Sequence, residues 1–127
     1  MKFHALALAP VVIGLLLMPG TASAHHGWVD FDEKADLTVQ GTVTGFYFVT
    51  PPCVVEFDVK DEKGQIQKWQ GEFASKSELA RKGWTAASLE SGEKLTFIGH
   101  PSKDGALAIH VIKVRTASGE LKLDLHE

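Results

Sequence analysis

The densest group of chemically reactive residues lies near the start of the chain, where His25 and His26 follow Ala22-Ser23-Ala24. If a signal peptidase cleaves after Ala24, the mature chain begins with a free α-amine, an imidazole on the same residue and a second imidazole beside it. These nitrogen donors suit Cu(II), Ni(II) and Zn(II), and the Irving–Williams order favours copper. Because an α-amine has a pKa of about 7.7–8.0 and an imidazole of about 6.5, a metal ion can displace their protons near neutral pH. The sequence therefore predicts a copper site at His25 and His26. The alternative is a polar start that only gives signal peptidase access to the cleavage site, with any metal binding adventitious.

Three further side chains are candidate ligands for this site. An N-terminal histidine that chelates through its amine and ring resembles the histidine brace of lytic polysaccharide monooxygenases and of periplasmic copper carriers. Such a brace needs an internal histidine, which His100 or His110 would have to supply. Cys53 would add a soft ligand and shift the preference toward Cu(I) or Zn(II).

Each of these three side chains also has a simpler interpretation. His100 stands beside Pro101 at a strand end, where a solvated loop residue is the commoner case, and His110 lies in an apolar strand, where a half-buried side chain is expected. Cys53 begins a strand, and the favoured interpretation is a small buried apolar residue.

The first residues follow the pattern of a secretory signal. Lys2 gives a short positive region, an apolar run extends from Ala5 to Met18, and Ala22-Ser23-Ala24 forms an A-x-A cleavage site. The apolar run is shorter than the roughly 20 residues of a membrane span. We therefore predict that residues 1–24 are a cleaved signal peptide, that the mature protein is periplasmic or secreted, and that it is not inserted in a membrane.

Composition limits what the mature chain can be. Removing 24 of the 127 residues leaves 103, enough for one domain over residues 25–127. Loss of Lys2 leaves 12 basic against 16 acidic side chains, a net charge of −4, with the basic residues scattered along the chain. This argues against nucleic acid as a partner. Because Cys53 is the only cysteine, the domain has no internal disulfide.

The first half of the mature chain has strand periodicity. Residues 37–47 alternate with period two, which places Tyr47 with the valines and Phe46 on the opposite face. The glycines at positions 41 and 45 suggest bends or close backbone approach. Thr50-Pro51-Pro52 predicts a turn, and strands are expected over residues 53–60 and 65–73, joined by a polar hairpin turn.

A short helix and two or three strands are predicted in the second half. Ser75 and Glu78 match a capping box, and Gly83 suits a left-handed helix stop. Strands are expected over residues 94–100, which Pro101 ends, and over residues 107–115, with a hairpin turn at Lys103-Asp104-Gly105 between them. Alternating leucines over residues 121–126 predict a sixth, edge strand.

This order of elements predicts the fold. Three strands, a capped helix and two or three further strands are typical of a small, mainly β, OB-like barrel of five or six strands, in which one short helix lies between strands three and four. Neither an internal repeat nor a low-complexity segment competes with this prediction.

Several segments resemble a family of small secreted bacterial proteins of a domain of unknown function. The resemblance is carried by Ala24-His25-His26, Gly41-Thr42-Val43-Thr44 and Arg81-Lys82-Gly83-Trp84, and it extends to the turn after Gly99-His100-Pro101. It covers nearly the whole mature chain and implies the fold and secretion, without implying any particular chemistry.

The chain departs from the family pattern at one place. The family carries Asn-Pro-His after the first strand, whereas this chain has Thr50-Pro51-Pro52 followed by Cys53. A candidate internal ligand is therefore missing, and a thiol stands beside the position.

These observations favour a binding or accessory module over an enzyme. The chain has no phosphate-binding glycine loop, serine elbow or Cys-x-x-Cys pair. Trp28, Trp69 and Trp84 are candidates for an aromatic ligand platform of the kind OB folds use, although Trp69 and Trp84 are better explained as core residues. The prediction is a periplasmic module with a copper site at the mature N-terminus and an unknown protein or small ligand as partner. The alternatives are a copper-dependent redox enzyme with a histidine brace and a purely structural protein-interaction domain.

Overall fold

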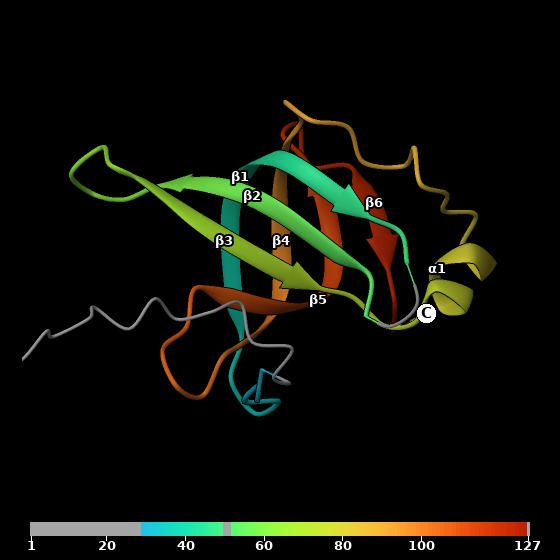
Figure 1. Ribbon diagram of the computed structural model, residues 1–127, viewed down its shortest axis with the longest axis horizontal. Helices are drawn as coiled ribbons and strands as arrows, with labels where there is room; N and C mark the ends of the chain where they lie inside the picture. The colour runs from blue at the N-terminus through green and yellow to red at the C-terminus, as the bar shows by residue number, and fades with distance from the viewer. Residues whose placement is uncertain (1–28, 50–51, 127) are drawn as a thin grey trace, which may run out of the picture.

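The computed structural model describes residues 29–49 and 52–126 of the chain. These residues form a mainly β fold (Figure 1). The elements follow in the order β1 (Leu37–Tyr47), β2 (Val54–Lys60), β3 (Ile66–Glu72), α1 (Lys76–Arg81), β4 (Lys94–Pro101), β5 (Ala108–Thr116) and β6 (Leu121–Asp124). The proposed boundary between residues 24 and 25 lies outside the described residues.

The strands close into a barrel. The sheet order is β3-β2-β1-β4-β5-β6, and a parallel pairing of β3 with β5, from Gln70↔Ala108 to Glu72↔His110, joins the two sides. The first five strands thus form the closed barrel, and β6 pairs with the C-terminal part of β5, from Lys113 to Arg115. The predicted OB-like barrel with one short helix between β3 and β4 is confirmed.

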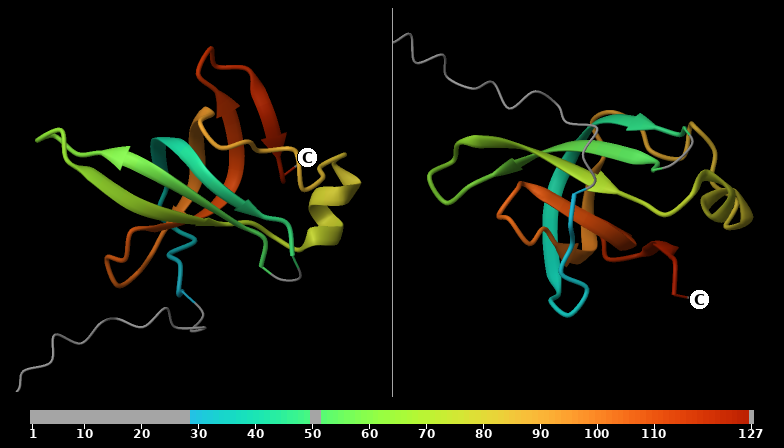
Figure 2. Two further views of the ribbon diagram at one scale, coloured as in Figure 1. Left: turned by 45° about the horizontal axis from the view of Figure 1, so that its top comes forward. Right: turned by 60° about the horizontal axis from the view of Figure 1, so that its bottom comes forward.

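The helix caps one end of the barrel, and the β2–β3 hairpin projects at the other (Figures 1 and 2). Ser75 is the N-cap, and its hydroxyl accepts a hydrogen bond from the Glu78 amide at 3.2 Å. Gly83 follows the helix with a φ of +83°, the left-handed conformation expected at this stop. Leu79 on α1 is fully buried, and Trp84 and Leu89 after it pack into the core, which was predicted for Trp84. The described residues include no helix long and apolar enough to span a bilayer.

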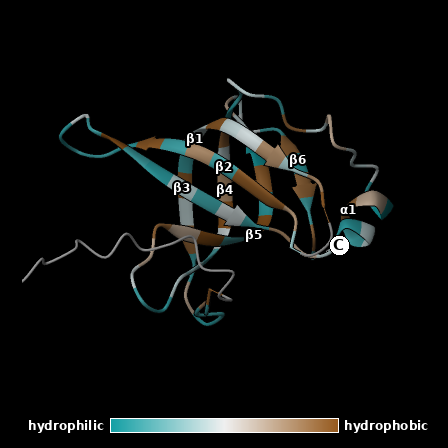
Figure 3. Cartoon of the chain, viewed as in Figure 1, coloured by the Kyte–Doolittle hydropathy of each residue, from teal (hydrophilic) through white to brown (hydrophobic). Residues whose placement is uncertain are grey.

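Alternation of apolar and polar residues along the strands supplies the core (Figure 3). Phe57 on β2 and Phe97 on β4 stack at the centre, with ring centroids 4.2 Å apart. Full burial of such a side chain stabilises a fold by about 1.5–3 kcal/mol. Gly41 makes this stacking possible, because a β-carbon there would collide with the Phe57 ring and approach the Asp58 carbonyl oxygen to 2.9 Å. The close backbone approach expected at Gly41 is confirmed.

The predicted facing of β1 is wrong beyond Val43. The register with β2 steps from Val43↔Phe57 to Gly45↔Glu56, so Thr44 is an extra residue in a β-bulge. Because of the extra residue, the side chains after Thr44 lie on the opposite face from the one predicted. Phe46 therefore packs against Phe73 and Trp84, with centroid distances of 5.9 Å in both pairs. Tyr47, expected inside, is 48% exposed.

The predicted end of the fourth strand is off by one residue. Pro101 does not interrupt β4 but is its last residue and pairs with Ile109. Its carbonyl oxygen accepts a hydrogen bond from the Asp32 amide at 2.9 Å, which ties the segment before β1 to this strand end.

Candidate functional site

His100 and His110 lie side by side across two neighbouring strands. They are register partners in the antiparallel pair of β4 with β5, and their ring centroids are 6.0 Å apart. The side chain of His100 is only 17% exposed, so its interpretation as a solvated loop residue is wrong. His110 is half-buried, as expected. The structure thus brings together the two internal histidines that the sequence offered as separate candidates.

A second bulge sets this pairing. The register of β4 with β5 steps from Ile98↔Lys113 to Gly99↔Val111, so Ile112 is an extra residue on β5. A β-carbon on Gly99 would collide with the carbonyl group of His110. Glycine at position 99 therefore allows the two strands to approach at the place where the histidines face each other.

The segment before β1 packs beside the two histidines. Phe31 forms an isolated bridge with Ser102, and its ring centroid lies 5.5 Å from that of His110. The amide of Lys103 donates to the Asp30 carbonyl at 2.8 Å, and the two side chains form an ion pair at 3.6 Å. Phe31 is a site residue that the sequence interpretation missed, because an isolated aromatic in a polar segment gives no periodic signal.

Hydrogen bonding and burial define the state of both imidazoles. His100 Nδ1 lies 2.8 Å from the Ala35 carbonyl oxygen, which can only accept, so Nδ1 carries the proton. In the neutral ring, the lone pair is then on Nε2. Burial and the nearby charge of His100 lower the pKa of His110, against smaller opposing effects of Glu33 and Glu78. A lower pKa favours the neutral form of His110, which is the form that binds metals.

Cys53 does not join this pair. It is fully buried among core residues, and its Sγ donates to the Val49 carbonyl oxygen at 3.1 Å. Burial raises the pKa of the thiol, against the lowering effects of that hydrogen bond and of Lys76. The favoured interpretation of Cys53 as a small buried apolar residue agrees with this position. Within residues 29–49 and 52–126, the structure contains no cluster of three or more His, Cys, Asp or Glu side chains able to hold a metal ion.

His25 and His26 lie outside the described residues, so their relation to the internal pair stays a prediction. Chain length allows a meeting, since His25 precedes Phe31 by only six residues. At about 3.3–3.6 Å per residue, the chain between them spans at most about 22 Å.

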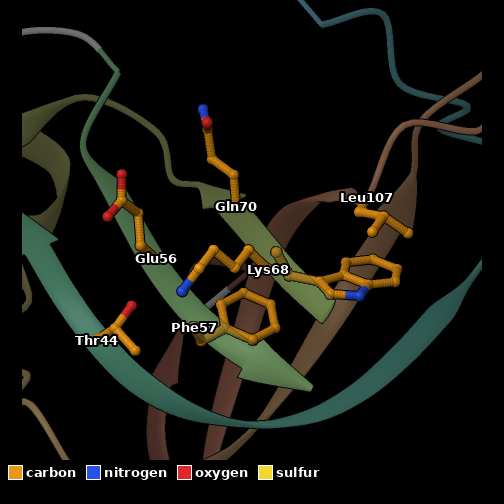
Figure 4. A pocket seen from close by; sticks show the side chains of 7 residues that line it. Thr44, Glu56, Phe57, Lys68, Gln70 and Leu107 are labelled. Carbon is orange, nitrogen blue, oxygen red and sulfur yellow. The ribbon is translucent and has the colours of Figure 1, made fainter. Parts of the chain in front are cut away.

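A separate pocket lies over β1, β2 and β3 (Figure 4). It has a volume of about 380 Å³ and is lined by Thr44, Glu56, Phe57, Lys68, Trp69, Gln70 and Leu107. Trp69 stacks on Phe57, and its Nε1 is buried without a hydrogen-bond partner among the described residues. Trp84 is in the core as expected and Trp28 lies outside the described residues, so the structure assembles no three-tryptophan platform from the part of the chain it describes.

The fold and these contacts define a small OB-like barrel protein in which His100 near the end of β4 lies beside His110 near the start of β5. The chain belongs to a family of unknown function (DUF6152), whose model matches residues 14–110. The matched segment contains His25, His26 and His100, and it ends at His110. The predicted resemblance to a domain of unknown function is confirmed.

Other comparisons add little to this assignment. A search of curated proteins gives no match. One similar solved structure is the crystal structure of the ZRD-deleted mutant of TiaS in complex with agmatine, with 15% sequence identity and a TM-score of 0.43. The alignment covers 73% of this chain and 25% of that chain, so this protein spans about a quarter of its length.

Proposed function

We propose that the mature protein is a periplasmic or secreted copper-binding module. Its site combines the α-amine and imidazoles of His25 and His26 with the internal pair of His100 and His110. The observation that carries this proposal is the 6.0 Å approach of the two internal rings beside the segment that leads to the N-terminus.

The donor set favours Cu(II). Imidazole and amine nitrogens rank copper above zinc in affinity. His100 presents Nε2, because its Nδ1 donates to the Ala35 carbonyl oxygen. In metal sites, a hydrogen bond from the ring nitrogen that does not bind the metal commonly fixes the orientation of the histidine ring and increases its basicity. The internal pair alone offers two nitrogens, so the N-terminal donors are needed to complete a site.

The test compares copper binding by the processed protein and by variants of each half of the site. Mass spectrometry first establishes that the chain begins at His25. Cu(II) is then titrated, with an electron paramagnetic resonance spectrum, into the native chain, a chain with one extra alanine before His25, and a His100→Gln/His110→Gln double variant. We expect both changes to weaken binding by at least about tenfold, equivalent to about 1.4 kcal/mol.

The exposed His126 provides the matched control, and His126→Gln is expected to bind like the native chain. The site proposal fails if the alanine-extended chain binds equally, if native affinity is only micromolar or weaker, or if cleavage occurs elsewhere. Loss of affinity in the extended chain alone would reject the internal half of the site. Rapid ascorbate-driven turnover by the copper-loaded protein would favour the redox enzyme over the binding module.

A further inference from the structure

The strands β1 and β2 separate at one end of the barrel and leave two strand edges without partners. Their pairing runs only from Thr42↔Asp58 to Tyr47↔Val54. Before Thr42, the residues Leu37–Gly41 pair with β4 alone, and beyond Asp58, β2 pairs with β3 alone as the hairpin leaves the barrel (Figure 1). An unpaired strand edge presents a row of free N–H and C=O groups that can bind another strand.

An open groove lies between these two edges. It has a volume of about 560 Å³, and its walls include Gln40, Thr42, Lys60, Ile66, Lys94 and Thr96; we call it the edge groove. Ile66 is 53% exposed there and presents an apolar side chain to the groove. The groove thus combines free main-chain groups with an apolar contact for a side chain.

The edge groove is locally basic in an acidic protein. Lys60 and Lys94 are exposed and form no ion pair in the part of the chain that the structure describes. Among the described residues that line the groove, Asp58 alone carries a carboxylate, and it is 3.5 Å from the ammonium group of Lys68. Two unpaired ammonium groups beside a strand edge favour an acidic partner, and they would repel the same two lysines of a second copy that paired edge to edge with this one.

We propose that the edge groove binds an extended, acidic peptide segment of another protein, which adds as a strand to the free edge of β1. Main-chain hydrogen bonds to residues 37–41 provide the register. Lys60 and Lys94 pair with acidic side chains on one face of the added strand, and Ile66, the register partner of Lys60, offers an apolar contact on that same face. This is strand addition, in which main-chain hydrogen bonds give affinity and side-chain contacts give specificity.

Lysines at a strand edge also have a purely protective role, because they discourage self-pairing. The two roles differ in their response to the charge of the added strand. A protective lysine repels any strand that lacks acidic groups and builds no stable complex, whereas a binding lysine produces a complex that depends on the acidic groups. The proposal does not depend on copper binding, and the experiment uses the metal-free chain.

The probe is a blocked decapeptide of alternating valine and glutamate, compared with the same peptide in which lysine replaces glutamate. Binding is measured by calorimetry and by amide chemical shifts of the ¹⁵N-labelled protein. We expect saturable binding of the acidic peptide alone, with shifts and slowed hydrogen exchange at Thr38, Gln40 and their neighbours. A Lys60→Glu/Lys94→Glu variant is expected to lose about tenfold or more in affinity.

Lys63→Glu is the matched control, because Lys63 is an exposed lysine at the hairpin tip outside the groove. It should change the affinity by less than about twofold, since rim charges distant from a partner contribute little. Equal binding of the lysine peptide, absence of binding by the acidic peptide, or shifts that spare residues 37–42 would overturn the proposal. A dimer of the native chain that the double charge reversal abolishes would assign the groove to a second copy and would also overturn it.

Discussion

The carbonyl group of His110 occupies the space where a β-carbon on Gly99 would stand. Because this contact is with backbone, no side-chain rotation can relieve it. We expect Gly99→Ala to destabilise the fold by about 1–3 kcal/mol, measured by chemical denaturation, and to shift the ring signals of His100 and His110 in nuclear magnetic resonance spectra.

Gly64→Ala gives the control for this prediction. Gly64 has a φ of +76° and open space around it. Alanine there would lower stability only through the strain of the left-handed conformation, about 1–2 kcal/mol. It should leave the histidine signals unchanged. Unshifted histidine signals in Gly99→Ala would show that this glycine does not set the geometry of the pair.

The pairing of His100 with His110 could be predicted in part from the sequence. Both histidines lie five residues from Gly105, which ends the predicted hairpin turn, so a hairpin centred there places them opposite each other. The capping box at Ser75 and the period-two strands were equally local signals, and they predicted the fold correctly.

The bulges could not be predicted in the same way. Whether Thr44 or Ile112 is an extra residue depends on the partner strand, and one sequence contains no information on that register. For this reason the facing of Phe46 and Tyr47 was predicted wrongly. The edge groove is also a consequence of where two strands separate, which depends on the curvature of the whole barrel.

The second prediction concerns the tautomer of His100. Because the Ala35 carbonyl oxygen can only accept, we expect neutral His100 to carry its proton on Nδ1 and to leave Nε2 unprotonated. Long-range ¹H–¹⁵N correlation spectra of the metal-free protein distinguish the two forms, with the exposed His126 as reference. A proton on Nε2 would contradict the hydrogen bond and would remove the atom that we assign to the metal.

The third prediction concerns Glu72 on β3, the register partner of His110. Burial raises the pKa of Glu72, against the lowering effect of a hydrogen bond from Gln70 at 3.3 Å. A carboxyl whose pKa is higher in the folded state than in the unfolded chain stabilises the fold below the unfolded pKa of about 4.3, and that contribution is lost as the pH rises through the folded pKa.

We therefore expect Glu72→Gln to raise the unfolding midpoint at pH of about 7, where the native carboxylate is ionised, and to have little effect below pH of about 4. Thermal unfolding at a series of pH values measures this difference. Glu62→Gln, at an exposed position in the β2–β3 turn, is the matched control and should show no such dependence. A stabilisation that persists unchanged at low pH would show that burial of the charge is not its cause.

The last prediction separates Cys53 from the proposed copper site. Its Sγ is turned into the core and donates to the Val49 carbonyl oxygen, and burial raises the pKa of the thiol. Since the thiolate is the reactive and metal-binding form, native Cys53 should react with iodoacetamide only as fast as the fold opens. Cys53→Ser keeps a donor for Val49 but buries a more polar group, so we expect a loss of about 1–3 kcal/mol in stability and unchanged Cu(II) affinity. A drop in Cu(II) affinity in the folded Cys53→Ser variant, or rapid alkylation of the native thiol, would contradict this separation. Cys53 would then be a candidate copper ligand, and the predicted metal preference would shift toward Cu(I).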